Sequence, residues 1–356
     1  MPELPEVQTI ADDLNKKVLG RKILKVWLDW PKLINLLEKR KGVLKLIKKP
    51  ALKEFEKVIK GKKIIKAHRR AKNALIDLSD GYMMLVHQKM TGHLLVGKWS
   101  IRKVVYEKPA LADSGYIHPV KSDEVGAKQF NGAGGHIRMN HKKDIVIPLE
   151  PQSIVADPYN RFVHVIFYLS DGNMLALSDI RKFAKIILGK KEDLENLPEL
   201  KELGLEPLDK KFKFNEFKEI ISKKTGKIKQ VLMDQKVIAG IGNIYSDDIL
   251  WLAKINPFRP ANKISDAELK ELFKAIRAIL NKAIKLRGSS ISDFRDTSGK
   301  KGGYGNVMLV YQREGEKCLR NDGGIIVRKK IGGRSTCYCP VCQAVEIQSV
   351  AESDKY

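Results

Sequence analysis

The sequence predicts an α+β protein, in which an N-terminal β-sandwich with flanking helices precedes a helical C-terminal region. Two segments, 74–87 and 163–179, place an Asp-Gly pair between apolar runs, the pattern of a β-hairpin. Residues 265–288 instead follow the period of a helix. All four cysteines lie beyond residue 317, which sets the end of the chain apart.

The first predicted element is a helix. After the opening MPELPEV, the apolar residues Val7, Ile10, Leu14 and Val18 recur at helical spacing, and Gly20 suits a helix end. We expect this helix to dock the N-terminus against the body of the protein.

The opening also offers unusual chemistry at Pro2. If Met1 is removed, Pro2 presents a free α-amine, which titrates near ~8 rather than the ~10.4 of a lysine. The unprotonated fraction is a nucleophile that can form a Schiff base. The competing interpretation is an ordinary solvent-exposed terminus.

The segment from about 99 to 161 matches no regular pattern. It contains the glycine-rich stretch NGAGGH and the histidines His118, His136 and His141, whose spacing fits no metal site. We expect a long surface loop here. A charged connector with Pro and Leu, residues 189–211, then separates the two halves of the chain.

The second half contains two distinctive helical segments. In LMDQKVIAGIGNIY a helix is expected to enter a glycine-rich turn, and Asn243 to begin the next helix. Such a turn can bind a phosphate, although a plain connection between helices explains it as well. Further on, Ser265 and Glu268 form a capping-box pattern ahead of an apolar stripe that Gly288 closes.

Net charge, apolar run lengths and cysteine placement limit the classes of protein to which this chain can belong. The chain has 356 residues and a net charge of +25, a field that attracts polyanions, and nucleic acid is the favoured partner. Lysine-rich usage in a thermophilic or AT-rich source would also raise the charge. No apolar run reaches the ~18 residues of a membrane span, and no secretion signal is visible. The clustered thiols favour a metal site in a reducing cytoplasm.

Three motifs occur together and in order: MPELPEV, AGIGNIY and GGRSTCYCPVCQ. With them the chain resembles the formamidopyrimidine-DNA glycosylases, bacterial enzymes that excise oxidised purines. The resemblance implies a catalytic β-sandwich domain (1–189, with an unusual insertion near 99–161), a linker (190–211), a helix–two-turn–helix DNA-binding domain (212–310) and a zinc-finger hairpin (311–345). It implies no role for residues 99–161.

The resemblance also implies roles for single residues. Pro2 matches the nucleophile that forms a Schiff base, Glu3 the catalytic acid, and Lys72 a lysine that reaches a phosphate near the lesion. Without the family, HRRAK around Lys72 is a basic patch that we would place on the solvated surface. Glu6 is the weaker carboxylate candidate.

Other matching positions would contact DNA. Met90, Arg181 and Phe183 match a wedge that fills the space left by an extruded base, and buried core residues are the alternative. Asn243 and Arg334 match phosphate-binding residues. Residues 287–305 resemble a flexible loop over the extruded purine.

The implied enzyme is a bifunctional glycosylase and abasic-site lyase of base excision repair. It would act as a monomer on damaged double-stranded DNA, remove 8-oxoguanine and formamidopyrimidines, and cleave the strand by β,δ-elimination. Two alternatives remain: an endonuclease VIII-like glycosylase for oxidised pyrimidines, whose relatives tend to begin Pro-Glu-Gly, and a non-catalytic lesion-binding protein.

The chain departs from the family at its metal site. The pair Cys339-x-x-Cys342 is intact, but Cys318 stands without the second thiol of its pair. A structural Zn²⁺ would be held by Cys318, Cys339 and Cys342 with either Cys337 or Asp322, and a metal-free hairpin is the alternative. A second departure is Asp248, where the family usually has Glu, and whose shorter side chain could weaken a structural hydrogen bond.

Overall fold

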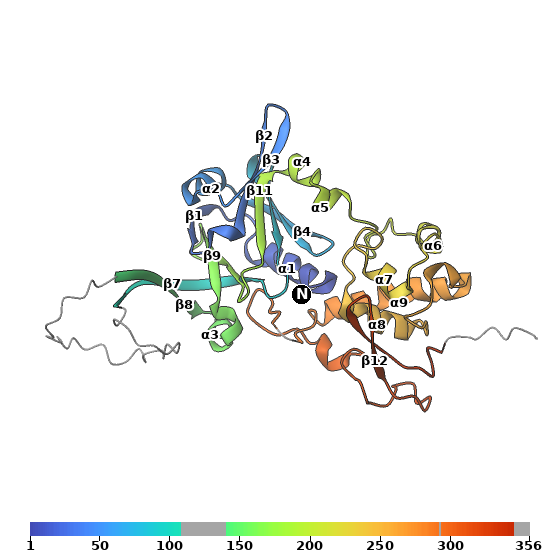
Figure 1. The fold of residues 1–356 in the computed structure, drawn as a ribbon. Helices are drawn as coiled ribbons and strands as arrows, with labels where there is room; N and C mark the ends of the chain where they lie inside the picture. Colours follow the sequence, from blue (N-terminus) through green and yellow to red (C-terminus); the bar gives the residue numbers. More distant parts are fainter. Residues whose placement is uncertain (108–139, 292, 345–356) are drawn as a thin grey trace, which may run out of the picture.

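The computed structural model describes residues 1–107, 140–291 and 293–344. A β-rich N-terminal half and a helical C-terminal half lie side by side, and the chain begins between them (Figure 1). The α+β class expected from the sequence is therefore confirmed.

The N-terminal half is a sandwich of two sheets. One sheet has the strand order β1-β9-β10-β7-β8 and the other β3-β2-β11-β6-β5-β4; within them only β2 and β11 pair in parallel. Both predicted hairpins form, as β5–β6 and β9–β10. The strands are β1 Ile23–Leu28, β2 Ile34–Arg40, β3 Val43–Lys48, β4 Ile64–Arg70, β5 Asn73–Leu78, β6 Tyr82–His87, β7 His93–Glu107, β8 Asn140–Glu150, β9 Val163–Leu169, β10 Met174–Ser178 and β11 Lys185–Lys190.

Helix α1, Leu4–Lys17, joins the sandwich to the helical half. Its apolar face (Val7, Ile10 and Leu14) is buried in the same core cluster as Phe167 of β9 and Ile186 of β11. Leu4, at its first turn, packs into the core of the helical half instead. The inward-facing apolar residues of the two sheets and the apolar stripe of α1 form one core, and Leu4 packs into the other. The N-terminus is therefore held between the two cores.

The helical half is built on α8 and α9. The capping box of Ser265 and Glu268 is present at the start of α9, and Gly288, at φ +77°, follows its end as expected. Besides α1, the helices are α2 Leu52–Ile59, α3 Gln152–Ala156, α4 Lys191–Glu195, α5 Pro198–Lys201, α6 Phe214–Ser222, α7 Ile228–Met233, α8 Asn243–Leu252 and α9 Asp266–Lys285. A hairpin of β12, Val327–Ile331, and β13, Arg334–Tyr338, completes this half.

The sequence predicted a loop over 99–161, and this prediction is wrong for much of the part that the structure describes. Strands β7 and β8 pair from Lys98 and Glu150 out to Glu107 and Asn140, so the chain leaves and re-enters the sandwich as a two-stranded arm (Figure 1). Paired backbone groups replace the solvent contacts of a loop, and the run of β-branched residues at 145–147 (Ile-Val-Ile) was the missed strand signal. His118 and His136 lie outside the described residues.

Candidate active site

Pro2 lies at the junction of the two halves. The Leu4 backbone N–H donates to the Gly240 carbonyl (3.0 Å), so α1 begins against the glycine-rich turn ahead of α8. Pro2 is buried, and it lines a small pocket with Met1, Glu6, Met90 and a segment after α9. Removal of Met1 would leave the Pro2 nitrogen as a free α-amine in this pocket.

The Glu3 carboxylate occupies the start of α8. It accepts hydrogen bonds from the backbone N–H groups of Gly242 (2.8 Å) and Ile244 (3.0 Å). The first turn of a helix offers unpaired N–H groups and a partial positive charge, which favour an anion. The anion that the glycine-rich turn holds in this structure is thus a carboxylate of the chain itself. Asn243 begins α8, as predicted.

The Glu6 carboxylate is 1% exposed and fully engaged. It accepts from the Glu3 backbone N–H (2.8 Å), the Tyr245 hydroxyl (2.5 Å) and the Ser289 backbone N–H (2.6 Å). Burial and the neighbouring Glu3 raise its pKa, and these three hydrogen bonds act in the opposite direction. Glu6 therefore ties α1 to α8 and to the segment after α9.

Lys72 faces these two carboxylates. It is 7% exposed, not on the solvated surface where a basic patch alone placed it. Burial lowers the pKa of its ammonium, while Glu3 and Glu6 act to raise it and Arg334 lowers it further. Arg334 is an exposed residue at the start of β13. The rest of the patch is also engaged, because Arg69 pairs with Glu206 (2.6 Å).

The three predicted wedge residues lie on two neighbouring loops. Met90 follows β6, whereas Arg181 and Phe183 follow β10; Met90 is 41% and Phe183 60% exposed. The loops are joined because Asp179 accepts hydrogen bonds from Thr91 and from the backbone of Arg181. The exposed fractions exclude a core position for either apolar residue. Met90 and Phe183 line one surface pocket together with a set of lysines: Lys32, Lys48, Lys89, Lys182 and Lys185.

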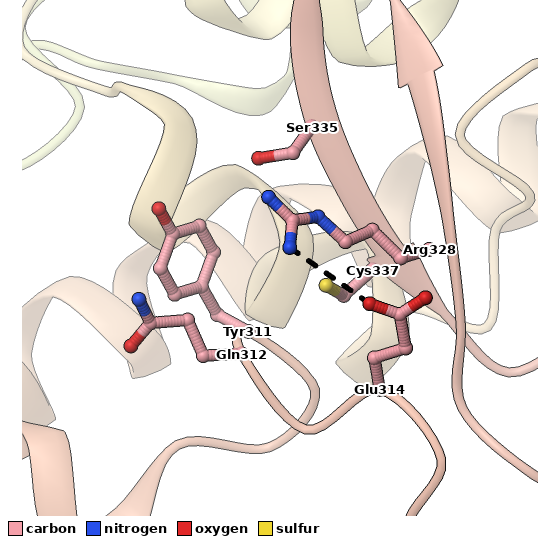
Figure 2. Close-up of a pocket in the computed structure, with 6 residues that line it drawn as sticks. All are labelled: Tyr311, Gln312, Glu314, Arg328, Ser335 and Cys337. Carbon is pink, nitrogen blue, oxygen red and sulfur yellow. Dashed lines mark ion pairs between the residues drawn. The ribbon is translucent and has the colours of Figure 1, made fainter.

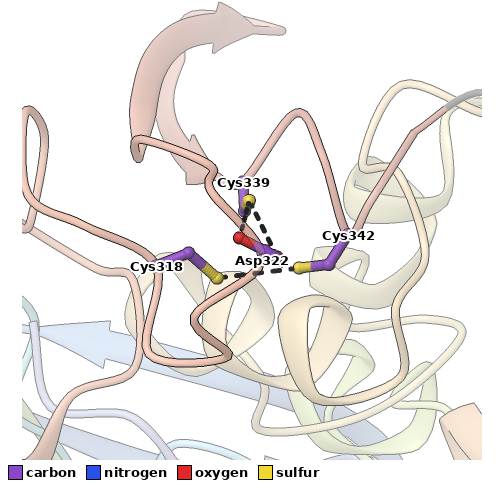
Figure 3. Close-up of side chains that lie close together, drawn as sticks. All are labelled: Cys318, Asp322, Cys339 and Cys342. Atoms are coloured by element: carbon purple, nitrogen blue, oxygen red, sulfur yellow. Dashed lines mark hydrogen bonds between the residues drawn. The ribbon is translucent and has the colours of Figure 1, made fainter.

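A second cluster at the far end of the helical half brings together potential metal ligands. One atom from each of Cys318, Asp322, Cys339 and Cys342 lies within 4.8 Å of all the others (Figure 3). Three thiols and one carboxylate are a donor set that suits tetrahedral Zn²⁺. Of the two sets left open by the sequence, the structure assembles the one with Asp322.

Cys337 lies outside this group. Two side chains that are two residues apart in a strand point to the same face, which would bring the Cys337 and Cys339 thiols together. Cys337 is in β13, but Cys339 follows the end of the strand, so this alternation does not extend to Cys339. The Cys337 thiol lines a separate pocket beside Tyr311, Ser335 and the Arg328–Glu314 ion pair (Figure 2). The structure therefore does not bring Cys337 to the other three cysteines.

The sequence singled out Asp248, whose side chain makes several structural hydrogen bonds despite being shorter than the usual Glu, but it missed the adjacent Asp247. Asp248 accepts from the Tyr304 hydroxyl (2.8 Å) and from the backbone N–H groups of residues 309–311. It is 0% exposed, and it fixes the turn that leads into the hairpin. The adjacent Asp247 forms an ion pair with Lys229 (2.7 Å). The only signal was two consecutive acids in an otherwise apolar helix.

Comparison with known proteins shows the family of the chain. The family model for the formamidopyrimidine-DNA glycosylase N-terminal domain matches residues 1–186, and the model for the H2TH domain of the same family matches residues 203–295. A formamidopyrimidine-DNA glycosylase of Pelotomaculum thermopropionicum is 37% identical over 97% of this chain and 100% of its own; that of Heliobacterium modesticaldum is 31% identical over 96% and 100%.

Solved structures of the Lactococcus lactis Fpg are also similar. Its complex with DNA that contains an abasic site has a TM-score of 0.70 and 27% identity, and covers 96% of this chain and 100% of its own. A complex of the same protein with DNA containing an oxidised pyrimidine has a TM-score of 0.69 and 27% identity over 97% and 100%.

Proposed function

The chain belongs to the formamidopyrimidine-DNA glycosylase family and is a glycosylase for repair of damaged DNA; we propose that it removes oxidised purines through a Schiff base at Pro2 and then cleaves the strand. The observation that carries this proposal is the placement of Pro2 and Glu3. Both are buried where the two halves meet, and the buried ammonium of Lys72 interacts electrostatically with Glu3.

The chemistry requires that Met1 be removed. The Pro2 nitrogen then attacks C1′ of the damaged nucleotide; the N–C1′ bond forms, the bond from C1′ to the base breaks, and the base leaves with a proton. Glu3, which must first take up a proton because it is held here as a carboxylate, gives that proton to the ring oxygen, and the sugar opens to an iminium ion on Pro2. Loss of the C2′ proton and then of the C4′ proton expels the two phosphates in turn by β,δ-elimination. The neutral form of the Pro2 amine starts this sequence.

We propose that the remaining predicted residues hold the DNA. Lys72, Asn243 and Arg334 would bind phosphates next to the lesion, and Met90, Arg181 and Phe183 would fill the gap that the extruded nucleotide leaves. The five lysines beside Met90 and Phe183 support this, because together they attract the phosphate backbone. The domain division that we propose is 1–189, 190–211, 212–310 and 311–345.

We further propose that Cys318, Asp322, Cys339 and Cys342 hold a structural Zn²⁺. The Cys318 and Cys342 sulfurs are 3.8 Å apart, and the Cys339 sulfur is 3.5 Å from an Asp322 oxygen. The ion would tie the loop before β12 to the loop after β13 and so fix the hairpin that carries Arg334.

A second candidate substrate is an oxidised pyrimidine. It is favoured by one observation, the similar Lactococcus lactis protein that was solved with oxidised-pyrimidine DNA. The opening Pro-Glu-Leu favours the purine instead.

The proposal is tested by borohydride trapping on a duplex with one 8-oxoguanine opposite cytosine. Protein shown by mass to lack Met1 should give a covalent adduct that maps to Pro2. Pro2→Gly should weaken trapping strongly, and Glu3→Gln should slow it. The same protein that retains Met1 is the matched control and should give no adduct. Trapping only on an oxidised-pyrimidine duplex would select the second candidate, and binding without an adduct on either duplex would overturn the lyase mechanism.

A further inference from the structure

The segment after α9 forms one wall of the Pro2 pocket and is fastened from the opposite half of the protein. Ser289, Ile291 and Phe294 line the pocket beside Pro2 and Glu6. Nine residues after Phe294, the backbone returns to the end of α9, where the Gly303 N–H donates to the carbonyl of the C-cap residue Leu286 (2.8 Å). The intervening turn lies against the sandwich.

The fastening is centred on Arg295, which is 1% exposed. Its Nε donates to Asp157 Oδ2 (2.5 Å), its guanidinium lies over the Tyr159 ring (4.9 Å to the centroid), and its Nη1 donates to the Phe294 carbonyl (2.8 Å). The same carbonyl accepts from the Ser290 hydroxyl (2.7 Å). Asp157 and Tyr159 therefore act on the pocket wall through one buried guanidinium.

A second set of contacts holds the tip of the turn. Asn160, 0% exposed, donates to the Gly299 carbonyl (3.3 Å), and the Ser153 hydroxyl donates to the Ser298 carbonyl (2.5 Å). Gly299, at φ +76°, approaches so closely that a Cβ there would lie 2.5 Å from the Asn160 nitrogen. Residues 153–160 directly follow the β7–β8 arm, so a stretch without an implied role supplies the anchor.

We infer that Asp157 is a positioning residue that sets the damaged-base pocket through Arg295. The inference rests on the proposed function and adds that base removal depends on the pocket wall, whereas strand cleavage does not. The pocket wall contacts the base before it leaves, whereas elimination at an abasic site needs only the Pro2 amine and Glu3. Loosening the wall should slow base removal and spare the lyase step, because a displacement of ~1 Å can cost on the order of a hundredfold in rate.

The test uses the full chain without Met1, under single-turnover conditions, with two duplexes. One contains 8-oxoguanine opposite cytosine, and the other a preformed abasic site. Asp157→Asn should lower the excision rate about tenfold or more and leave abasic-strand cleavage unchanged. Asp157→Glu should restore part of the excision rate. Asp171→Asn is the matched control, because it breaks the Arg21–Asp171 pair (2.9 Å) on the far side of the sandwich and should change neither rate.

The two duplexes distinguish a failure of the proposed function from a failure of the positioning role of Asp157. Wild-type protein inactive on both duplexes would contradict the proposed function itself. Wild-type activity on both, with Asp157→Asn losing both equally or neither, would overturn the positioning role alone. Should Asp157→Asn fail to fold, Ser153→Ala removes a single hydrogen bond of the same anchor and should show the same selective, smaller loss.

Discussion

The Glu3 carboxylate lies so close to the backbone of Gly242 that no side chain fits between them. The Gly242 N–H donates to one oxygen (2.8 Å), and a Cβ on Gly242 would lie 2.4 Å from the other. Gly242 has extended backbone angles, so the close approach and not the conformation requires glycine. Glu3 is the acid of the proposed reaction and belongs to the N-terminal segment. Its carboxylate is nevertheless positioned by the backbone of the helical half.

We expect Gly242→Ala to displace the Glu3 carboxylate. Excision and abasic-strand cleavage should both fall, on the order of a hundredfold for a shift of ~1 Å. The protein should also lose about 1–3 kcal/mol of stability to overpacking. Gly226→Ala is the matched control, since its Cβ position meets only an ordinary van der Waals contact, 3.5 Å from the Val231 side chain. Single-turnover rates and urea unfolding check both effects; normal rates in Gly242→Ala would contradict the role given to this contact.

Glu6 should make the protein less stable as the pH rises. Burial raises the pKa of this carboxyl above its ordinary 4.5, so the folded state retains a proton that the unfolded state has lost. Stability from this group is present below pH 4.5 and declines above it, by up to about 1.4 kcal/mol per pH unit, until the folded pKa is passed.

Glu6→Gln removes this titration, and the free energy of unfolding by urea should then fall less between pH 4.5 and 7 than it does in the wild type. Glu195→Gln, on the short helix α4, serves as a control carboxyl. Equal pH slopes in the wild type and Glu6→Gln would show that Glu6 does not titrate above its ordinary range.

Metal content should depend on Asp322 and not on Cys337. Purified wild-type protein should carry one zinc per chain, and Asp322→Ala should lose most of it because the tetrahedral set loses its oxygen donor. Cys337→Ser should retain the metal, since that thiol lies in another pocket. Elemental analysis after dialysis against a chelator measures the difference. Loss of zinc in Cys337→Ser with retention in Asp322→Ala would reverse the assignment.

The sequence predicted the parts of the fold that depend on local patterns. The capping box at Ser265, the hairpin turns at Gly81 and Gly172, and the helix start at Asn243 are local signals, and each is present in the structure. The resemblance identified the active-site candidates because its motifs include the chain start. Local signals suffice where one turn or one cap determines the conformation.

Long-range contacts could not be predicted in the same way. Lys72 looked like part of a solvated patch because its burial and its electrostatic interaction with Glu3 and Glu6 join segments that are far apart in the chain. The choice between Asp322 and Cys337 depended on where β13 ends, and strand ends are poorly defined by sequence. The paired arm over part of 99–161 likewise depends on two strands that a long segment separates.

The last prediction concerns the buried ion pair that docks the β12–β13 hairpin. Lys229 and Asp247 are at most 1% exposed; the Lys229 ammonium also donates to the Ser335 carbonyl (2.8 Å), and Asp247 accepts from the Cys337 backbone N–H (2.9 Å). Lys229→Met leaves the Asp247 charge buried without its partner, so we expect a loss of about 3–5 kcal/mol.

The loss should be localised to the hairpin before the whole protein unfolds. Amides of residues 327–338 should exchange faster with solvent in Lys229→Met, and excision should weaken because Arg334 is carried by β13. Lys223→Met is the control, because its pair with Glu219 is 69% and 68% exposed and is screened by solvent. Hairpin exchange as slow as in the control would mean that metal binding, and not the ion pair, holds Arg334 in place.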